Sequence, residues 1–257
     1  MTKTYNASIV RCQDPESVGA QAADIIISAI KEHERSHPER PFVLGLCTGG
    51  TPIPTYNELI RRNRAGEFSF ENVWTFNLDE YLGLNGDHEQ SYRYFMDTYL
   101  FNHIDIDKSH TAVPSGVSRD AETECASYEQ RIQQMGGIDL WLIGIGPHTG
   151  HIAFNEPGSS IDSRTRIVNL TQHTIEANKR FFENDMSKVP TKAISAGVGT
   201  ILSARKIVLI ATGANKSDVV FKSLKCPMTE SCPASFLQSH PQVTYVVDRD
   251  AAAEISE

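Results

Sequence analysis

Short apolar runs that are rich in β-branched residues alternate along this chain with longer segments of helical periodicity. This alternation is typical of a parallel sheet whose strands are connected by crossover helices. Several of the runs are apolar at every position, which predicts strands buried on both faces and therefore an internal sheet. The sequence predicts strands at residues 8–11, 42–46, 73–76, 140–145, 207–211 and 243–247.

The segments between these runs predict the helices that cover the sheet. Their apolar spacing places them at residues 16–34, 52–64, 90–102, 119–135, 192–203 and 215–224. Because there is no internal repeat or Pro/Ser-rich linker, we expect one α/β domain over residues 1–257, with helices on both faces of a mainly parallel sheet. Polar residues dominate between residues 157 and 189, and a long irregular segment of this kind predicts a lid or binding loop.

The charge and the cysteines exclude several classes of protein. The formal net charge is -8 at pH 7, whereas nucleic-acid binders concentrate Lys and Arg, so we expect no nucleic-acid partner. No apolar stretch approaches the ~18 residues of a membrane span, and residues 1–6 lack the apolar core of a signal peptide. We therefore expect a cytoplasmic protein with no membrane partner. The five cysteines form no Cys-x-x-Cys pair, which predicts reduced thiols.

Residues 45–52, with the sequence GLCTGGTP, connect a predicted strand to a predicted helix that begins near a proline. Glycines at such a position let backbone N–H groups turn toward an anion, and the helix N-terminus adds favourable dipole charge. The segment predicts a phosphate-binding loop. It is not a Walker A loop, because Thr51 and Pro52 stand where Lys and Ser or Thr would be needed. A tight turn without a ligand is the alternative.

Acidic residues follow the third predicted strand, in segment 76–81 with the sequence FNLDEY. Ligands of open α/β sheets gather at the carboxyl ends of the strands, so a carboxylate there is well placed for proton transfer. Either Asp79 or Glu80 could therefore act as a general base. A helix cap or a solvated loop is the alternative.

Residues 144–157, with the sequence GIGPHTGHIAFNEP, also begin at a strand end and bring together two histidines and a glutamate. The glycine spacing does not fit G-x-G-x-x-G, so we expect no dinucleotide cofactor. A metal site made of His148, His151 and Glu156 would match no standard zinc spacing, and we expect neither metal nor cofactor. A histidine held by a carboxylate is a common proton shuttle, which favours acid–base chemistry at this loop.

Two basic residues are further candidates. Arg180 lies in the predicted lid, and Lys216 follows a strand at the start of a predicted helix. Either could close on a phosphate, Arg through its planar fork and Lys as a point charge. The alternative for each is an ordinary solvated cation.

Taken together, these segments resemble the glucosamine-6-phosphate deaminase family. The similarity extends over residues 41–247, and its most specific parts are LGLCTGGTP at 44–52, TFNLDEY at 75–81, GHIAFNEP at 150–157 and SRTR at 163–166. The resemblance implies a Rossmann-like sheet. It also implies the conversion of glucosamine 6-phosphate into fructose 6-phosphate and ammonia, with a small amino-sugar phosphate as the partner.

The same resemblance implies roles for individual residues. Asp79 would be the base that moves a proton between C2 and C1 of the sugar, and His151, oriented by Glu156, would help to open the sugar ring. The residues implied to hold the phosphate are Thr48, Gly49, Gly50, Thr51, Arg180 and Lys216. The epimer of the sugar, glucosamine or galactosamine, and assembly into a homo-oligomer are left open.

The sequence departs from the family's pattern in two places. Members carry an acidic residue directly before the Gly-His pair, whereas residues 147–149 here are Pro-His-Thr, one residue longer and without a carboxylate. The ring-opening relay therefore lacks its usual acid, unless His148 has taken part of that role. Members with an allosteric site also carry an Arg, a serine pair and a Lys. Arg166 and the serines match, but Val168 replaces the Lys, which argues against allosteric activation.

Two other functions are compatible with the same scaffold. One is a 6-phosphogluconolactonase-like hydrolase, whose histidine motif usually lacks the FNEP sequence found here at residues 154–157. The other is a non-catalytic sugar-phosphate sensor, which the missing acid favours. Sensors of this kind normally carry a helical DNA-binding domain, and no basic helix-turn-helix segment precedes residue 41.

Overall fold

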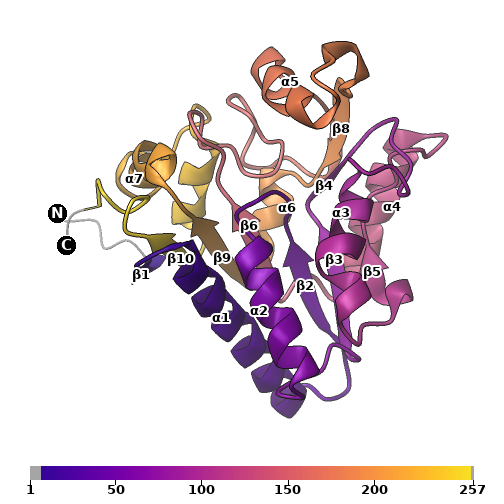
Figure 1. Ribbon diagram of the computed structural model, residues 1–257, viewed down its shortest axis with the longest axis vertical. Helices are drawn as coiled ribbons and strands as arrows, with labels where there is room; N and C mark the ends of the chain where they lie inside the picture. The colour runs from indigo at the N-terminus through magenta and orange to yellow at the C-terminus, as the bar shows by residue number, and fades with distance from the viewer. Residues whose placement is uncertain (1–6, 256–257) are drawn as a thin grey trace.

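A seven-stranded sheet forms the centre of the computed structural model, which describes residues 7–255 (Figure 1). Its strands lie in the order β1-β10-β9-β6-β2-β3-β5, and every neighbouring pair is parallel. The predicted α/β sheet is therefore confirmed, and the carboxyl ends of all its strands meet at one edge. The strands are β1 (Ala7–Cys12), β2 (Phe42–Leu46), β3 (Val73–Asn77), β5 (Thr111–Ala112), β6 (Leu140–Gly144), β9 (Lys206–Ala211) and β10 (Val243–Asp248).

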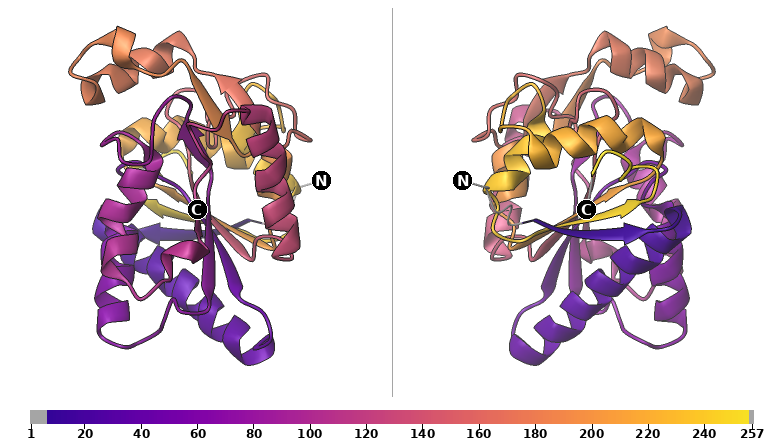
Figure 2. Two further views of the ribbon diagram at one scale, coloured as in Figure 1. Left: turned by 90° about the vertical axis from the view of Figure 1, so that its right-hand side faces the viewer. Right: turned by 90° about the vertical axis from the view of Figure 1, so that its left-hand side faces the viewer.

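Helices cover both faces of this sheet (Figure 2). One face carries α1 (Pro15–Ser36), α2 (Ile53–Arg64) and α3 (Tyr92–Tyr99), and the other carries α4 (Ala121–Gln134). These helices agree with the predicted ones to within a few residues. Among residues 7–255 no helix is long and apolar enough to cross a membrane. The residues from which we expected no signal peptide, 1–6, lie outside the described part of the chain.

The centre of the sheet is packed without room for further side chains. All five residues of β2 are buried, as the unbroken apolar run predicted. Gly45 lies in the middle of this strand because the ring of Trp141, on β6, occupies the space beside it. A Cβ atom on Gly45 would lie 1.7 Å from that ring, so no larger residue fits.

A second sheet lies above the carboxyl ends of the first and corrects one prediction (Figure 1). It consists of β4 (Asp79–Tyr81), β8 (Lys192–Ser195) and β7 (Arg166–Asn169), paired antiparallel in that order. The helix predicted at residues 192–203 is wrong in its first part. Buried Ala193 and Ile194 pair with strands on both sides, and this pairing overrides their local helical tendency. The helical part is α6 (Val198–Leu202), and the last helix, α7 (Ser217–Lys225), follows β9.

The segment predicted as a lid, residues 157–189, contains more regular structure than expected. It includes β7 and the short helix α5 (Gln172–Asn178), which lies above the carboxyl edge of the large sheet (Figure 1). None of the seven residues of α5 is buried. Its partly buried Ile175 packs against a small hydrophobic cluster of Tyr81, Leu170 and Ala193, so the position of α5 depends on this contact and on a small number of polar contacts.

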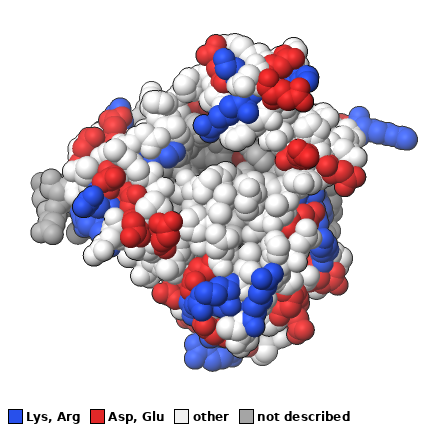
Figure 3. All heavy atoms as spheres, viewed as in Figure 1, with Lys and Arg blue, Asp and Glu red and all other residues white. Residues whose placement is uncertain are grey.

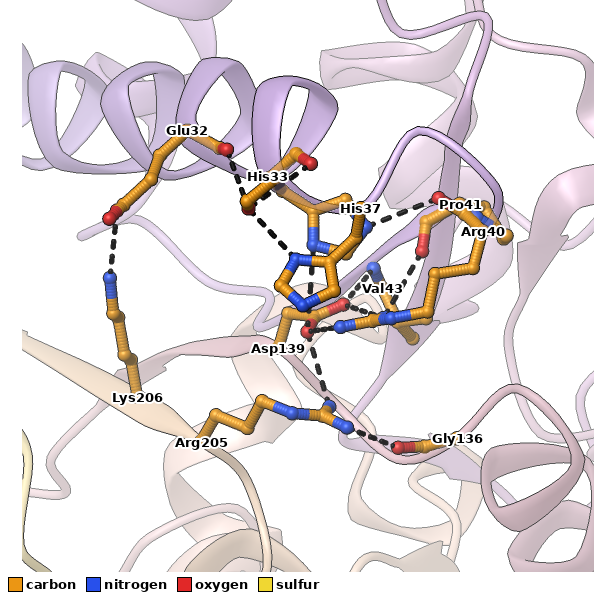
Figure 4. Close-up of polar contacts among 11 residues, drawn as sticks. Glu32, His33, His37, Arg40, Pro41, Val43, Gly136, Asp139, Arg205 and Lys206 are labelled. Atoms are coloured by element: carbon orange, nitrogen blue, oxygen red, sulfur yellow. Dashed lines mark hydrogen bonds and ion pairs between the residues drawn. The ribbon is translucent and has the colours of Figure 1, made fainter.

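A buried ion-pair cluster lies at the opposite edge of the sheet, where β2 and β6 begin (Figure 4). Asp139, directly before β6, is 6% exposed. Its carboxylate accepts hydrogen bonds from Arg40 at 2.8 and 2.9 Å, from Arg205 at 3.1 Å and from the backbone N–H of Val43 at 2.9 Å. Burial alone would raise the pKa of Asp139, but these donors hold it below the usual value of a carboxyl group.

Replacing Asp139 with alanine should lower the free energy of unfolding by about 2–4 kcal/mol, because the part-buried guanidinium of Arg40 and the buried N–H of Val43 would lose their acceptor. Urea unfolding at pH 7 measures the loss. The folded-state pKa of Asp139 is lowered, so the ionised carboxylate stabilises the fold at every pH above the usual carboxyl pKa. The difference in free energy of unfolding between the wild type and Asp139→Ala should disappear as the pH falls through the folded-state pKa.

Arg205→Ala is the matched control for this variant, because it removes the half-exposed partner and leaves the carboxylate bound. We expect a loss of less than about 1 kcal/mol. Equal losses for Asp139→Ala and Arg205→Ala would contradict the assignment of Asp139 as the centre of the cluster.

Candidate active site

Three loops meet at the carboxyl edge of the large sheet, after β2, β3 and β6. The chain leads from β2 to β3 on one side and from β6 to β9 on the other, so β2 and β6 flank a topological switch point, where open α/β sheets bind ligands. A cleft of about 730 Å³ opens there, and Figure 3 shows the hollow with Lys or Arg atoms on its rim. The residues predicted for the site all line this cleft: Thr48, Gly49, Gly50, Thr51, Asp79, His151, Glu156, Arg180 and Lys216.

The loop after β2 provides the candidate anion cradle. Gly49 has a φ angle of 96°, in the left-handed region that glycine adopts without strain. The turn leads directly into α2, and no side chain of the described residues caps that helix through a hydrogen bond. The positive end of the α2 dipole therefore lies beside the cleft, where it favours a negatively charged group.

The adjacent carboxylates of Asp79 and Glu80 have different surroundings. Glu80 accepts hydrogen bonds from the backbone N–H groups of Tyr81, Tyr92 and Arg93 at 2.8–3.0 Å, so it caps the start of α3. Asp79 lines the cleft instead and is 7% exposed. Burial and the charge of Glu80 raise the pKa of Asp79 to about 8, and burial raises that of Glu80 to about 7. Of the two residues predicted as a base, Asp79 is the one that meets the cleft.

The loop after β6 brings His151, Glu156 and Thr149 together. The Nδ1 atom of His151 lies 3.4 Å from Oε2 of Glu156 and 3.0 Å from the hydroxyl oxygen of Thr149. That hydroxyl donates to Oε2 of Glu156 at 3.1 Å. Thr149, which stands in the place of the missing acid, thus bridges the histidine and the glutamate.

His148, which we considered as a replacement for the missing acid, contacts α5 instead of Glu156. Its ring makes an edge-to-face contact with the ring of His173 on α5, with 5.4 Å between the centroids. The structure therefore does not bring His148 into the His151–Glu156 group. Among residues 7–255 no three His, Cys, Asp or Glu side chains are arranged to hold a metal ion, so the metal alternative for His148, His151 and Glu156 finds no support in the geometry.

Two local features fix the position of His151 and Glu156. Gly146 lies under the imidazole ring, and a Cβ atom there would lie 2.1 Å from it, so only glycine permits this packing. The buried amide of Asn155 donates to the backbone carbonyls of Ile152 and Ala196. The loop is therefore attached to the end of β8, the strand that the sequence predicted as a helix.

The two predicted phosphate ligands approach the cleft from different elements. Lys216, before α7, donates to the backbone carbonyl of Ile145 and forms no ion pair with a carboxylate of the described residues. Burial lowers the pKa of Lys216 to about 8. Arg180 follows α5, and its guanidinium carbon lies 4.6 Å from the centroid of the Phe181 ring.

Three contacts of this site were missed by sequence reasoning. Thr174, on α5, donates from its hydroxyl to Oε1 of Glu156 at 3.1 Å. Asn178, also on α5, donates to the hydroxyl of Tyr81 at 2.8 Å. Thr149 could have been found, because it fills the position of the absent acid. Thr174 and Asn178 carry no such signal, since polar residues are ordinary in an irregular segment.

This fold and this cleft are typical of α/β enzymes that act on a small molecule. Residues 13–246 match the family described as "Glucosamine-6-phosphate isomerases/6-phosphogluconolactonase", and the chain belongs to this family. "Glucosamine-6-phosphate deaminase 2" of Giardia intestinalis is 52% identical over 92% of this chain and 89% of its own length. The "Glucosamine-6-phosphate deaminase" of Cellvibrio japonicus is 49% identical over 97% of this chain and 92% of its own.

Solved structures give the same family and fold. A structure described as a monomeric glucosamine-6-phosphate deaminase is 43% identical, with a TM-score of 0.90 over 96% of this chain and 99% of that one. The 6-phosphogluconolactonase of Trypanosoma cruzi has a TM-score of 0.80 over 99% of this chain and 98% of its own, at 20% identity. At that identity the second likeness concerns the fold alone.

Proposed function

We propose that this protein converts glucosamine 6-phosphate and water into fructose 6-phosphate and ammonia. The observation that carries the proposal is the arrangement of one cleft. A buried carboxylate, Asp79, lies in the same hollow as the His151–Glu156 pair and the anion cradle after β2. The names of relatives about 50% identical to this chain support the same substrate and reaction.

His151 is the group proposed to open the sugar ring. Ring opening removes a proton from the hydroxyl on C1 and delivers one to the ring oxygen. Thr149 donates its only hydroxyl hydrogen to Glu156, so it accepts from Nδ1–H of His151. This leaves Nε2 of the neutral ring able to take up and return a proton, while Glu156 stabilises the imidazolium that forms in between.

Asp79 is the base proposed for the isomerisation of the open-chain sugar. Its carboxylate takes the proton from C2 and returns it to C1, while the oxygen on C1 gains a proton and the amino nitrogen loses one, so that the double bond moves and C2 becomes an imine. Water then adds to this carbon, and ammonia leaves as the ketone of fructose 6-phosphate forms. A pKa raised to about 8 suits this task, because a carboxylate of higher pKa is a stronger base near neutral pH.

The phosphate is the group by which the cleft is proposed to hold the sugar. A chain with a net charge of -8 needs local positive potential to retain a dianion. The loop of residues 48–51 and the α2 dipole provide part of it, and Lys216 provides a full charge that no carboxylate neutralises among the described residues. Arg180 provides a second charge from the segment after α5, which would cover the bound sugar as a lid.

Turnover of glucosamine 6-phosphate tests the proposal directly. The purified protein should release ammonia and fructose 6-phosphate in equal amounts. Parallel reactions with galactosamine 6-phosphate and with 6-phosphogluconolactone identify the epimer and separate deamination from lactone hydrolysis. Binding of the amino sugar without release of ammonia would instead support a sensor and would overturn the proposed activity.

The same reaction should proceed at an unchanged rate in excess EDTA, because each proposed step uses only side chains of the protein and water. The rate of ammonia release before and after overnight incubation with the chelator measures this. Loss of activity that returns when Zn²⁺ is added would contradict the prediction and would revive the metal interpretation of His148, His151 and Glu156.

A further inference from the structure

We infer that Thr174 is a positioning residue of the active site, which aligns the His151–Glu156 pair only while α5 lies over the cleft. The inference rests on the proposed function and assigns to the segment above the cleft a part in ring opening. It follows from the hydrogen bonds of one carboxylate and from the way in which α5 is held.

Each oxygen of the Glu156 carboxylate has its own partners. Oε2 lies 3.4 Å from Nδ1 of His151 and accepts the hydroxyl of Thr149, whereas Oε1 accepts the hydroxyl of Thr174. Burial alone would raise the pKa of Glu156, but the hydrogen bonds from His151, Thr149 and Thr174 bring it below the usual value. Thr174 is the only one of these donors that belongs to α5, so it connects the relay to a different part of the chain.

A carboxylate with only one oxygen engaged can rotate about its terminal torsion, which is broad. The bond from Thr174 engages the second oxygen and keeps Oε2 directed at Nδ1 of His151. Thr174 is itself held, since its hydroxyl lies 2.9 Å from that of Thr171, whose hydroxyl also accepts the backbone N–H of Thr174 and caps α5.

The helix that carries Thr174 is attached through side-chain contacts at both ends and through its partly buried Ile175, which packs against the small cluster of Tyr81, Leu170 and Ala193. At its start, His173 contacts His148 and Thr174 contacts Glu156; at its end, Asn178 donates to the hydroxyl of Tyr81 on β4, the strand of Asp79. Because α5 fully buries no side chain, these few contacts together decide whether it lies on the cleft. Movement of α5 away from the cleft would therefore release Glu156 from one of its hydrogen bonds.

Thr174→Val tests the inference, because valine keeps the shape of threonine and lacks its hydroxyl. We expect kcat to fall about 10-fold, the effect of losing one hydrogen bond to a charged group. Binding of 2-amino-2-deoxyglucitol 6-phosphate, the reduced substrate that has no ring to open, should change less than about 2-fold. Thr174→Ser should restore most of the rate. Thr191→Val makes the same change at an exposed position near this segment and should have no effect.

A double-mutant cycle distinguishes positioning from a general structural role. If Thr174 acts through Glu156, then Thr174→Val should not slow a Glu156→Gln variant further, whereas independent effects would multiply. The inference would be overturned by any of three results: effects that multiply in the double variant, equal losses in kcat and in binding of the reduced substrate, or a Thr174→Val variant with full activity.

One measurement remains decisive if the wild type does not release ammonia, in which case the proposed function fails on its own. In protein labelled with ¹⁵N-histidine, the ring N–H of His151 should exchange with water several times faster in Thr174→Val than in the wild type. This measurement needs no turnover. Equal exchange in the two proteins would show that Thr174 does not hold the pair.

Discussion

Asp79→Asn should lower kcat at least ~100-fold and leave the affinity for glucosamine 6-phosphate almost unchanged. Asparagine keeps the size and position of the side chain but cannot accept the C2 proton, and water is a poor base at neutral pH. An interaction that acts only in the transition state is expressed in kcat and not in ground-state binding. Ammonia release and calorimetric titration of the variant give the two quantities.

The same substitution should make the protein more stable. The folded-state pKa of Asp79 is about 8, above that of an unfolded carboxyl group, so folding takes up a proton between these values and stability falls as the pH rises through this range. Asparagine does not titrate. Each pH unit between the two pKa values is worth about 1.4 kcal/mol, so at pH 8 the variant should exceed the wild type by several kcal/mol in free energy of unfolding, with little difference at pH 4.

Glu80→Gln is the matched control, because it removes the adjacent charge. Glu80 accepts two backbone N–H groups at the start of α3 and that of Tyr81 on β4, so its replacement should affect kcat less than Asp79→Asn does. A Glu80→Gln variant that loses kcat by the same factor as Asp79→Asn would reverse the assignment of the two carboxylates.

Lys216→Ala should weaken the binding of glucosamine 6-phosphate by about 10- to 100-fold, or about 1–3 kcal/mol. The Lys216 ammonium is withdrawn from water and has no carboxylate partner among the described residues, so its charge is available to a phosphate dianion. Binding is best measured in the Asp79→Asn background, where the substrate is not consumed. The difference should shrink as the pH rises above about 8, where the lysine of the free protein loses its proton.

Lys222→Ala provides the comparison for this variant. Lys222 lies on α7 but pairs with Asp218 at the surface, so its removal should change affinity less than about 2-fold. Equal affinity in Lys216→Ala and the wild type would remove Lys216 from the phosphate site.

Most of the large sheet could be predicted from the sequence, because inner strands such as β2 are buried on both faces and therefore apolar at every position. The edge strand β5 has only two residues and was not predicted. The second sheet could not be predicted. β4 has three residues and carries the acidic pair 79–80, and β8 begins with Lys192 in a sequence of mixed tendency. Their pairing depends on partners distant along the chain, and local propensity does not report such partners.

The candidate site was predicted to a large extent, because its residues follow strands whose carboxyl ends must meet at one edge. Asp79, His151 and Lys216 all come from such positions. The contact from Thr174 could not be predicted. A hydroxyl becomes part of a relay only through its distance from another side chain, and no spacing in the sequence expresses that distance.

The small sheet also bears on how the chain reaches its folded state. Strand β4 pairs with β8, and the bond from Asn178 to Tyr81 joins residues 97 positions apart. The hydrophobic cluster that this sheet buries is small, with Tyr81, Leu170 and Ala193, and it is separate from the main core that contains Trp141. A part of the chain with few buried apolar contacts is the less stable part and forms its native packing later. We therefore expect refolding to restore the fluorescence of the buried Trp141 before it restores turnover, so that the protein passes through a state that is compact but inactive.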